Sequence, residues 1–403
     1  MSLDLTKIAS QVEGMATRLK ASSQQRQQHR QQALNVLSDE TIDLDHLKRK
    51  IVASKTSWLV ADPVEGLDRH YKAPPTPTEF TVIAADGSHI DVDRHRSTRC
   101  YLINIGSVIL DYGSSPGAAL DSHPQLYFDD ADLIMAPPRG SGREQPIEGA
   151  LLGIKRSVEE CRHLASLAAE LPSGVSSLAL VDGSLILWGL VSKDYPEFIL
   201  EALLDRGFIH CLNEIRKLNK DRSIAVASYI SFPRSTDVVN ALRVAVCPHE
   251  IPDCDRYCAD SASGKRECDA VAGVQDRELF FYRLTEGERS ALFISQSSIV
   301  RKRYGIHRVY FFYLRVDDEI ARIEIPEWVA KDKNLLGLVQ ALVLDQCRRG
   351  QGYPVALSEA HEQAVITGAD RENFQQLLEI SLAEEHIPIT ASAKSRSKRT
   401  RWL

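Results

Sequence analysis

Two copies of the triplet Asp-Gly-Ser, each directly after an apolar run, constrain this chain more than any other feature of its sequence. Asp86 begins the first triplet and follows the apolar residues 81–85, and Asp182 begins the second and follows residues 178–181. Short apolar runs of this kind are typical of buried strands. The glycine after each aspartate lets a backbone or a ligand approach closely. The pattern therefore predicts a carboxylate at the end of each of two buried strands.

Two carboxylates placed in this way indicate a site for a divalent cation. Ligands of α/β proteins bind outside the carboxyl ends of strands, so Asp86 and Asp182 on neighbouring strands would face the same ligand. Carboxylate oxygens suit hard cations such as Mg²⁺ or Mn²⁺. A single Asp-Gly-Ser is most often only a turn. Two of them at corresponding places favour the metal site.

A third carboxylate is expected from a helix predicted over residues 154–171. Glu160 lines up with Leu164 near the packed side of this helix, whereas Glu159 shares the solvent-facing side with Lys155. We prefer Glu160 as the ligand, with Glu159 as the alternative. Farther along, Tyr353 precedes a proline and is expected to end a loop.

His361 is expected to open the next helix, where its imidazole could bind a metal or transfer a proton. A lone histidine is, however, more often structural. Strand and helix patterns interleave over residues 80–385, which predicts an α/β fold with a mixed sheet. Residues 1–72 differ, because their helical spacing predicts two helices joined by a Gln-rich polar segment at 22–32. This arm is expected either to contact a second copy or another partner, or to fold on its own core.

The charge of the chain limits how it could bind a nucleic acid. With 49 basic and 55 acidic residues the net charge is −6, so a nucleic-acid partner would need a local basic groove. The segment 391–403 is a basic tail without acidic residues, which suits either a solvated end or a phosphate contact. No apolar run approaches the roughly 18 residues of a membrane span, and no secretory signal is visible at the start. We therefore expect a cytoplasmic protein that does not enter a membrane.

Eight cysteines are too few to predict a disulfide framework in a chain of 403 residues. Half of them lie in a polar insertion at 247–268, namely Cys247, Cys254, Cys258 and Cys268. Four thiolates at this spacing could hold a structural Zn²⁺ or an iron–sulfur cluster. The spacing matches no common pattern of either kind, and free thiols are the default alternative.

Taken together, these motifs resemble the NurA nuclease family. The resemblance lies in the two triplets, in the helix with Glu160, and in Tyr353 followed eight residues later by His361. It extends to residues 101–106, 227–231 and 322–328. Similar segments are spread over residues 80–375, so only the N-terminal arm and the basic tail lie outside the expected NurA nuclease domain at 80–385.

The resemblance implies an RNase H-like α/β core related to the Argonaute nuclease domain. It implies a Mn²⁺-dependent nuclease, with 5′-to-3′ exonuclease and single-strand endonuclease activity, that processes DNA ends in double-strand break repair. It also implies a homodimer that works with a HerA-type hexameric ATPase. The family's carboxylates correspond to Asp86, Glu160 and Asp182, and its tyrosine and histidine to Tyr353 and His361.

These roles agree with two-metal hydrolysis, in which a pair of cations activates water and stabilises the departing oxygen. Asp86 would bridge the metals, and Asp182 and Glu160 would hold one each. His361 would be a further ligand or a proton shuttle. Tyr353 would contact a phosphate, stack on a base, or pack under the site.

Basic side chains offer a path for the DNA strand. Arg234, Arg301 and Arg303 are candidates for contacts with phosphates, which would make binding salt-sensitive and sequence-tolerant. The chain has no Walker-type nucleotide motif, so ATP-driven movement must come from a partner. Three other hypotheses stay open. One is a non-catalytic clamp that binds DNA ends or regulates the translocase, and another is an RNase or general phosphodiesterase using the same carboxylates. The third is a structural protein stabilised by zinc.

Overall fold

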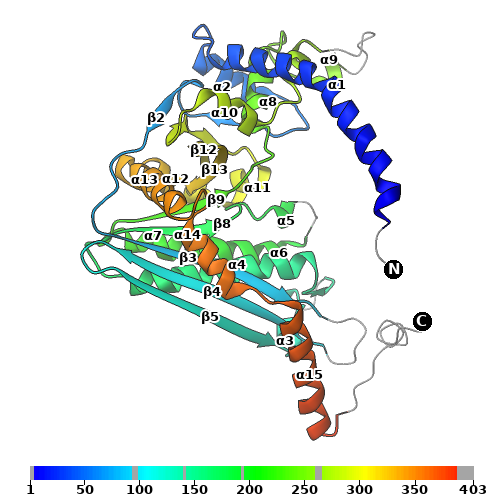
Figure 1. The fold of residues 1–403 in the computed structure, drawn as a ribbon, viewed down its shortest axis with the longest axis vertical. Helices are drawn as coiled ribbons and strands as arrows, with labels where there is room; N and C mark the ends of the chain where they lie inside the picture. Colours follow the sequence, from blue (N-terminus) through cyan, green and yellow to red (C-terminus); the bar gives the residue numbers. More distant parts are fainter. Residues whose placement is uncertain (1–3, 93–98, 139–141, 192–194, 259–265, 388–403) are drawn as a thin grey trace. The chain divides into compact units, whose positions relative to one another are not determined.

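The computed structural model describes residues 4–92, 99–138, 142–191, 195–258 and 266–387 (Figure 1). The chain forms two compact units, each built from segments that are separate in sequence. Unit 1 comprises Met1–Ala73, Ile230–Arg301 and Arg308–Glu324, and unit 2 comprises Pro74–Tyr229, Lys302–His307 and Ile325–Leu403. The predicted basic tail at 391–403 lies outside the described residues.

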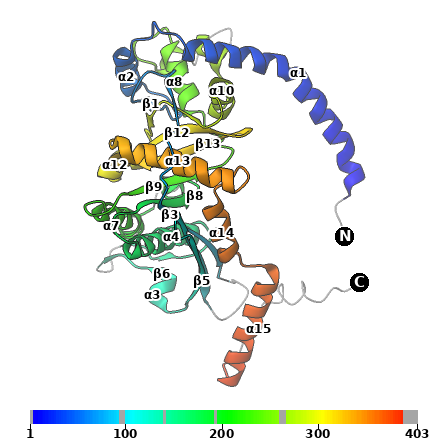
Figure 2. The same cartoon turned by 60° about the vertical axis from the view of Figure 1, so that its left-hand side comes forward.

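Unit 2 contains a mixed sheet, as predicted. Its strands, in the order β9-β8-β3-β4-β5 (Figures 1 and 2), are Ile224–Ile230, Ser176–Asp182, Phe80–Ile90, Tyr101–Tyr112 and Gly117–Tyr127. Strands β3, β4 and β5 are antiparallel neighbours, whereas β8 runs parallel to β3 and β9 runs parallel to β8. Strand β5 was not predicted, because most of its residues are exposed and it lacks an apolar run.

Helices flank this sheet, which confirms the α/β class. The described helical segments of unit 2 are α3 (Asp130–Leu133), α4 (Ala150–Glu170), α5 (Trp188–Val191), α6 (Glu197–Leu200), the π-helical η2 (Glu201–Ile209), α7 (His210–Leu218), the 3₁₀ turn η4 (Gly305–His307), α12 (Glu327–Ala330), α13 (Lys333–Arg349), α14 (Val355–Ala364) and α15 (Gly368–Glu384). Strands β6 (Ile134–Met135) and β7 (Gln145–Pro146) pair with each other in an antiparallel sheet of their own. Helix α4 buries an apolar stripe that includes Ile154, Val158 and Cys161, as its 3.6-residue spacing predicts.

Unit 1 has its own strands and helices. Its strands are β1 (Asp62–Pro63), β2 (His70–Lys72), β10 (Glu288–Ser290), β11 (Phe293–Ile294), β12 (Val309–Val316) and β13 (Glu319–Pro326). Its helices are α1 (Leu5–Leu37), α2 (Leu44–Ala53), α8 (Asp237–Ala245), α9 (Cys254–Tyr257), the 3₁₀ turn η3 (Glu267–Val271), α10 (Asp276–Arg283) and α11 (Ser298–Arg303). The strands follow the order β1-β11-β12-β13, and β10 pairs with β12 and β2.

Helix α1 differs from its prediction. The Gln-rich segment 22–32 is not a linker but part of this one continuous helix, since glutamine and arginine are good helix formers and no proline interrupts it. Only Ala33 and Leu37 of α1 are buried, while Val12 and Met15 near its start are about half exposed.

The N-terminal segment does not fold as an arm of its own. Leu37 and Leu47 enter one hydrophobic core with Leu242 of α8, Phe280 of α10 and Phe311 of β12. The segment predicted to end at residue 72 is thus the first part of unit 1, which ends at Ala73 and resumes at Ile230.

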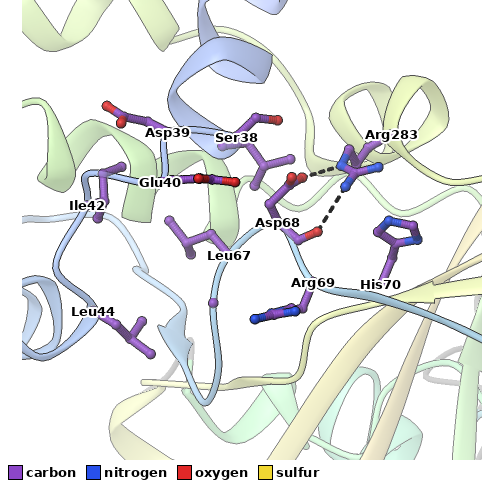
Figure 3. A pocket seen from close by; sticks show the side chains of 12 residues that line it. Ser38, Asp39, Glu40, Ile42, Leu44, Leu67, Asp68, Arg69, His70 and Arg283 are labelled. Atoms are coloured by element: carbon purple, nitrogen blue, oxygen red, sulfur yellow. Dashed lines mark hydrogen bonds and ion pairs between the residues drawn. The ribbon is translucent and has the colours of Figure 1, made fainter.

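Unit 1 also holds an open cavity of about 600 Å³ between the end of α1, the start of α2 and the segment before β2 (Figure 3). Arg283 lies at its rim and donates hydrogen bonds to the side chain and, at 3.1 Å, to the backbone carbonyl of Asp68. No residue of the predicted site lines this cavity. Among the described residues, no helix combines the length and the apolar character that crossing a membrane requires.

Candidate active site

Strand β3 continues through the first Asp-Gly-Ser triplet. Asp86 and Gly87 pair with Gly106 and Ile105 of β4. The prediction that a strand ends at Asp86 was therefore wrong, because β4 still offers backbone partners beyond the point where β8 ends. The second triplet does follow the prediction, since Asp182 is the last residue of β8.

The parallel pairing of β3 with β8 sets the two aspartates side by side. Ala85 is in register with Val181, so Asp86 and Asp182 are the next residues on adjacent strands. Neighbouring residues in register point to the same face of a sheet. Burial raises the pKa of Asp182, and the negative charge of Asp86 raises it further.

Helices α14 and α4 pack closely against the two faces of the sheet near Asp86 and Gly87 of β3. A Cβ built on Gly106, the partner of Asp86, would lie 2.2 Å from the carbonyl oxygen of Ala360 in α14. A Cβ on Gly87 would lie 2.7 Å from Oε1 of Glu160 in α4. Because successive residues of a strand face opposite sides, α14 covers the face of Asp86 and α4 covers the other. Each glycine permits a helix to come closer than any other residue would.

His361 reaches Asp86 from α14. Its Nδ1 lies 2.7 Å from Oδ2 of Asp86, and 63% of its side chain is exposed. The prediction that His361 opens a helix was wrong, because α14 begins at Val355, directly after Pro354, and His361 lies in its last turn. Proline suits the position before a helix, which explains the earlier start.

Three polar side chains that were not predicted hold the end of α14 against the sheet. Asn104 of β4 donates through Nδ2 to the carbonyl oxygens of Gln363, at 3.1 Å, and Ala364, at 3.0 Å. Ser88 of the first triplet also donates to the carbonyl of Ala364. Ser122 of β5 donates to Oδ1 of Asn104 at 2.9 Å, which fixes the orientation of the amide. These bonds satisfy carbonyls that the helix end leaves free, and they set the position of His361.

Glu160 lies on the other face, over Gly87. Its side chain is buried, and burial raises its pKa to about 8. The positive charge of Arg156 lowers this pKa, whereas the negative charges of Asp86 and Asp182 raise it. Nε of Arg156 is 2.9 Å from Oε1 of Glu160, but the directions of these groups do not make a hydrogen bond, and neither atom has another hydrogen-bond partner among the described residues.

Glu159 faces away from this site. It pairs with Lys155 at 3.3 Å and with Arg162 at 2.6 Å. The sequence already predicted that Glu159 shares one side of this helix with Lys155, whereas Glu160 lies nearer the packed side. The geometry therefore favours Glu160 as the third carboxylate.

Tyr353 contacts the second aspartate. Its hydroxyl donates to Oδ1 of Asp182 at 2.9 Å, and its ring meets Tyr229 edge-on at 5.4 Å between centroids. Burial raises the pKa of Asp182, and the Tyr353 hydrogen bond opposes this by lowering it. Tyr353 is thus both a packed aromatic and a hydrogen-bond donor to the site.

A comparison with known families identifies the segment that contains the five predicted site residues, namely Asp86, Glu160, Asp182, Tyr353 and His361. Residues 80–366 match the NurA domain, which is more than half of the chain. The chain belongs to the NurA family. Membership indicates a nuclease-related role in DNA repair, and the match begins at the first residue of β3. A comparison with curated proteins gave no match.

The donor set of this NurA protein suits a hard divalent cation. Asp86, Asp182 and Glu160 offer carboxylate oxygens, and Oε1 of Glu160 is buried without a hydrogen-bond partner among the described residues. In the described part of the chain, no group of three or more His, Cys, Asp or Glu side chains is already arranged to hold a metal ion. The three carboxylates contact His361, Tyr353 and Arg156 instead.

The basic residues predicted to contact DNA are divided between the two units. Arg303 forms ion pairs with Asp205, at 2.7 Å, and with Glu197, so its charge is locally balanced. Arg234 and Arg301 are exposed residues of unit 1, whereas the five site residues belong to unit 2.

The cysteines of the polar insertion belong to unit 1 and are free thiols in the structure. Cys268 is buried, and Cys247, Cys254 and Cys258 are partly buried. The pKa of Cys254 is raised by burial, and the neighbouring Cys258 and Cys268 add to this effect. Among the described residues no group of three or more His, Cys, Asp or Glu side chains is arranged to hold a metal ion, so a structural metal at these cysteines stays a prediction.

Proposed function

We propose that this NurA-family protein is a Mn²⁺-dependent DNA nuclease that processes ends in double-strand break repair. The observation that carries the proposal is the meeting of Asp86, Glu160 and Asp182 from three different elements, with His361 and Tyr353 beside them. The negative charges of Asp86 and Asp182 raise the pKa of Glu160, and the charge of Asp86 raises that of Asp182. A bound cation would remove this repulsion. Mg²⁺ is the alternative ion, because it takes the same ligands.

The strand order supports an RNase H-like core as part of this proposal. Three antiparallel strands, β3 to β5, are followed by the parallel β8 and β9 on the other side of β3. Asp86 then comes from β3, the first strand of this sheet, and Asp182 from the end of β8, the fourth. Glu160 comes from α4, the helix that precedes β8.

The cation would be held by Asp86, Asp182 and Glu160, and it would supply an activated water and a counter-charge for the departing oxygen. The chain's own groups orient the ligands. Tyr353 holds Oδ1 of Asp182 through its hydroxyl, and Arg156 keeps a positive charge beside Glu160, which favours the ionised carboxylate.

His361 is the group placed to move a proton. With its proton on Nδ1 it donates to Asp86, and Nε2 is then free to accept a proton from, or return one to, a reacting oxygen. Its exposed ring is accessible to a substrate. We therefore assign His361 to proton transfer, with metal ligation as the alternative role.

Cleavage polarity, action on ends and on internal single-stranded sites, a homodimer and a HerA-type ATPase partner are further parts of the proposal. Their support is the family membership, with its nuclease-related role in DNA repair.

Digestion of matched 5′-labelled DNA and RNA strands tests the proposal. Wild type with Mn²⁺ should cleave DNA, a chelator should stop the reaction, and Asp86→Ala should be inactive. Glu214→Ala, which removes an exposed carboxylate from α7, should cleave like wild type. Preferred cleavage of RNA would favour the RNase hypothesis. Equal activity of Asp86→Ala and wild type would reject the site.

A further inference from the structure

A row of basic side chains leads away from the carboxylates on the α4 side of β3. Arg156 lies one turn before Glu160, and a Cβ on Gly87 would be 3.0 Å from its Cγ, so Arg156 covers Gly87. His89 is two residues farther along β3 and so shares this face. Arg371 of α15 donates through Nη2 to the backbone carbonyl of His89 at 3.0 Å.

One polar atom of this row lacks a partner. Nδ1 of His89 is buried without a hydrogen bond among the described residues, whereas Nε of Arg156 makes no hydrogen bond but is ion-paired with Oε1 of Glu160 at 2.9 Å. Arg371 is exposed and forms no ion pair with any residue that the structure describes. Buried polar groups without partners are uncommon in folded proteins and call for a ligand, an ion or water.

The positive charge of Arg371 favours an anion here, because Arg156 is already paired with Glu160 at 2.9 Å. Burial is the largest cause that lowers the pKa of His89. The positive charges of Arg156 and Arg371 lower this pKa further, whereas the negative charge of Asp91 raises it. The oxygens of Asp91 already accept hydrogen bonds from the backbone N–H groups of Val92, at 2.8 Å, and Gly149, at 3.0 Å. Asp91 is therefore engaged at the start of α4, and guanidinium groups are well suited to bind a phosphate in two-point fashion.

We propose that Arg156, His89 and Arg371 bind a phosphate of the nucleic-acid strand next to the one that is cleaved. This inference rests on the proposed nuclease function, because it places the strand across Gly87 with its cleaved phosphate at the carboxylates. The row would fix the position of the strand without reading its sequence, since phosphate contacts are the same for every base.

The salt dependence of DNA binding tests this inference without any cleavage. Binding of a labelled single strand is measured by fluorescence anisotropy in chelator at several salt concentrations. Each phosphate contact adds about 0.7 to the slope of log affinity against log salt. Arg371→Ala should reduce the slope by about this amount and weaken binding by about tenfold at low salt. Arg371→Lys should restore most of the slope.

Arg162→Ala is the matched control, because Arg162 is an exposed arginine of α4 that pairs with Glu159. It should keep the wild-type slope. Arg156→Gln should act like Arg371→Ala, and its melting temperature shows whether the variant is folded. Unchanged slopes in Arg371→Ala and in folded Arg156→Gln, or an equal loss in Arg162→Ala, would overturn the inference. If the variants reduce the salt slope as predicted but the wild-type protein does not cleave DNA with Mn²⁺, only the proposed nuclease function is rejected.

Discussion

His361 and Asp86 are 275 positions apart in sequence, yet Nδ1 of the histidine lies 2.7 Å from Oδ2 of the aspartate. The contact is possible because Gly106, opposite Asp86 in β4, leaves room for the backbone of α14. It orients the imidazole so that Nε2 faces away from the aspartate. The same geometry places His361, the proposed proton-transfer group, and Asp86, a proposed metal ligand, on one face of the sheet.

Replacing Glu160, but not its neighbour, should abolish cleavage. Glu160 is buried over Gly87, whereas Glu159 pairs with Lys155 and Arg162 at the other side of α4. We expect Glu160→Gln to lower the rate of DNA cleavage with Mn²⁺ by at least about a hundredfold, and Glu159→Gln to change it less than about threefold, since such pairs contribute little. The opposite ranking of the two variants would show that Glu159 is the ligand.

The stability that Glu160 contributes should decline as pH rises. Burial raises the pKa of Glu160 from an ordinary 4.5 to about 8, so the folded protein holds this proton more tightly than the unfolded chain. The stabilisation is complete below about pH 4.5 and is lost as pH rises to about 8. In chelator, the melting temperature of wild type minus that of Glu160→Gln should therefore fall between pH 5 and pH 8.5.

Added Mn²⁺ should reverse this trend, because ionised Glu160 is the form that binds the metal. A difference in melting temperature that does not change with pH would contradict the raised pKa.

A methyl group at Gly87 should disable the site without unfolding the protein. The new Cβ would lie 2.7 Å from Oε1 of Glu160 and 3.0 Å from Cγ of Arg156. These side chains must move, at a cost of about 1–3 kcal/mol in unfolding free energy. We expect Gly87→Ala to lose Mn²⁺ affinity, measured by calorimetry, and at least tenfold in cleavage. Gly153→Ala on α4, which would meet no atom within 4 Å, should keep both.

Removing the Asn104 side chain should release the last turn of α14. Asn104→Ala loses two hydrogen bonds to helix carbonyls and should cost about 1–3 kcal/mol. We expect faster hydrogen exchange in α14 and slower cleavage, because His361 loses its fixed position. Asn219→Ala is the control, since Asn219 also makes two backbone hydrogen bonds, both to Ile224. Equal loss of cleavage in the two variants would mean that Asn104 serves stability alone.

The sequence was sufficient to propose the five site residues, which stay predictions. Local signals indicated Asp86, Glu160 and Asp182, whereas Tyr353 and His361 were proposed from the resemblance to the NurA family. Apolar runs before Asp86 and Asp182 mark buried strands, and the helical spacing around Glu160 distinguishes its two faces. The α/β class with a mixed sheet followed from the same periodicities and is confirmed.

What the sequence could not show depends on contacts between distant segments. The hydrogen bonds from Asn104 and Ser88 to Ala364 join residues about 260–276 positions apart, and no local pattern predicts them. Strand β3 continues past Asp86 only because β4 pairs with it there. The N-terminal segment joins unit 1 through a core whose other residues follow Ile230.

Single-turnover cleavage by the two aspartate variants and their combination tests the central claim most directly. If Asp86 and Asp182 hold the same cations, Asp86→Asn and Asp182→Asn should each lower the rate of DNA cleavage with Mn²⁺ by at least about a hundredfold, and the double variant should be no slower than the worse single one. Losses that multiply in the double variant, or a single variant that cleaves like wild type, would show that the two aspartates do not form one hydrolytic centre.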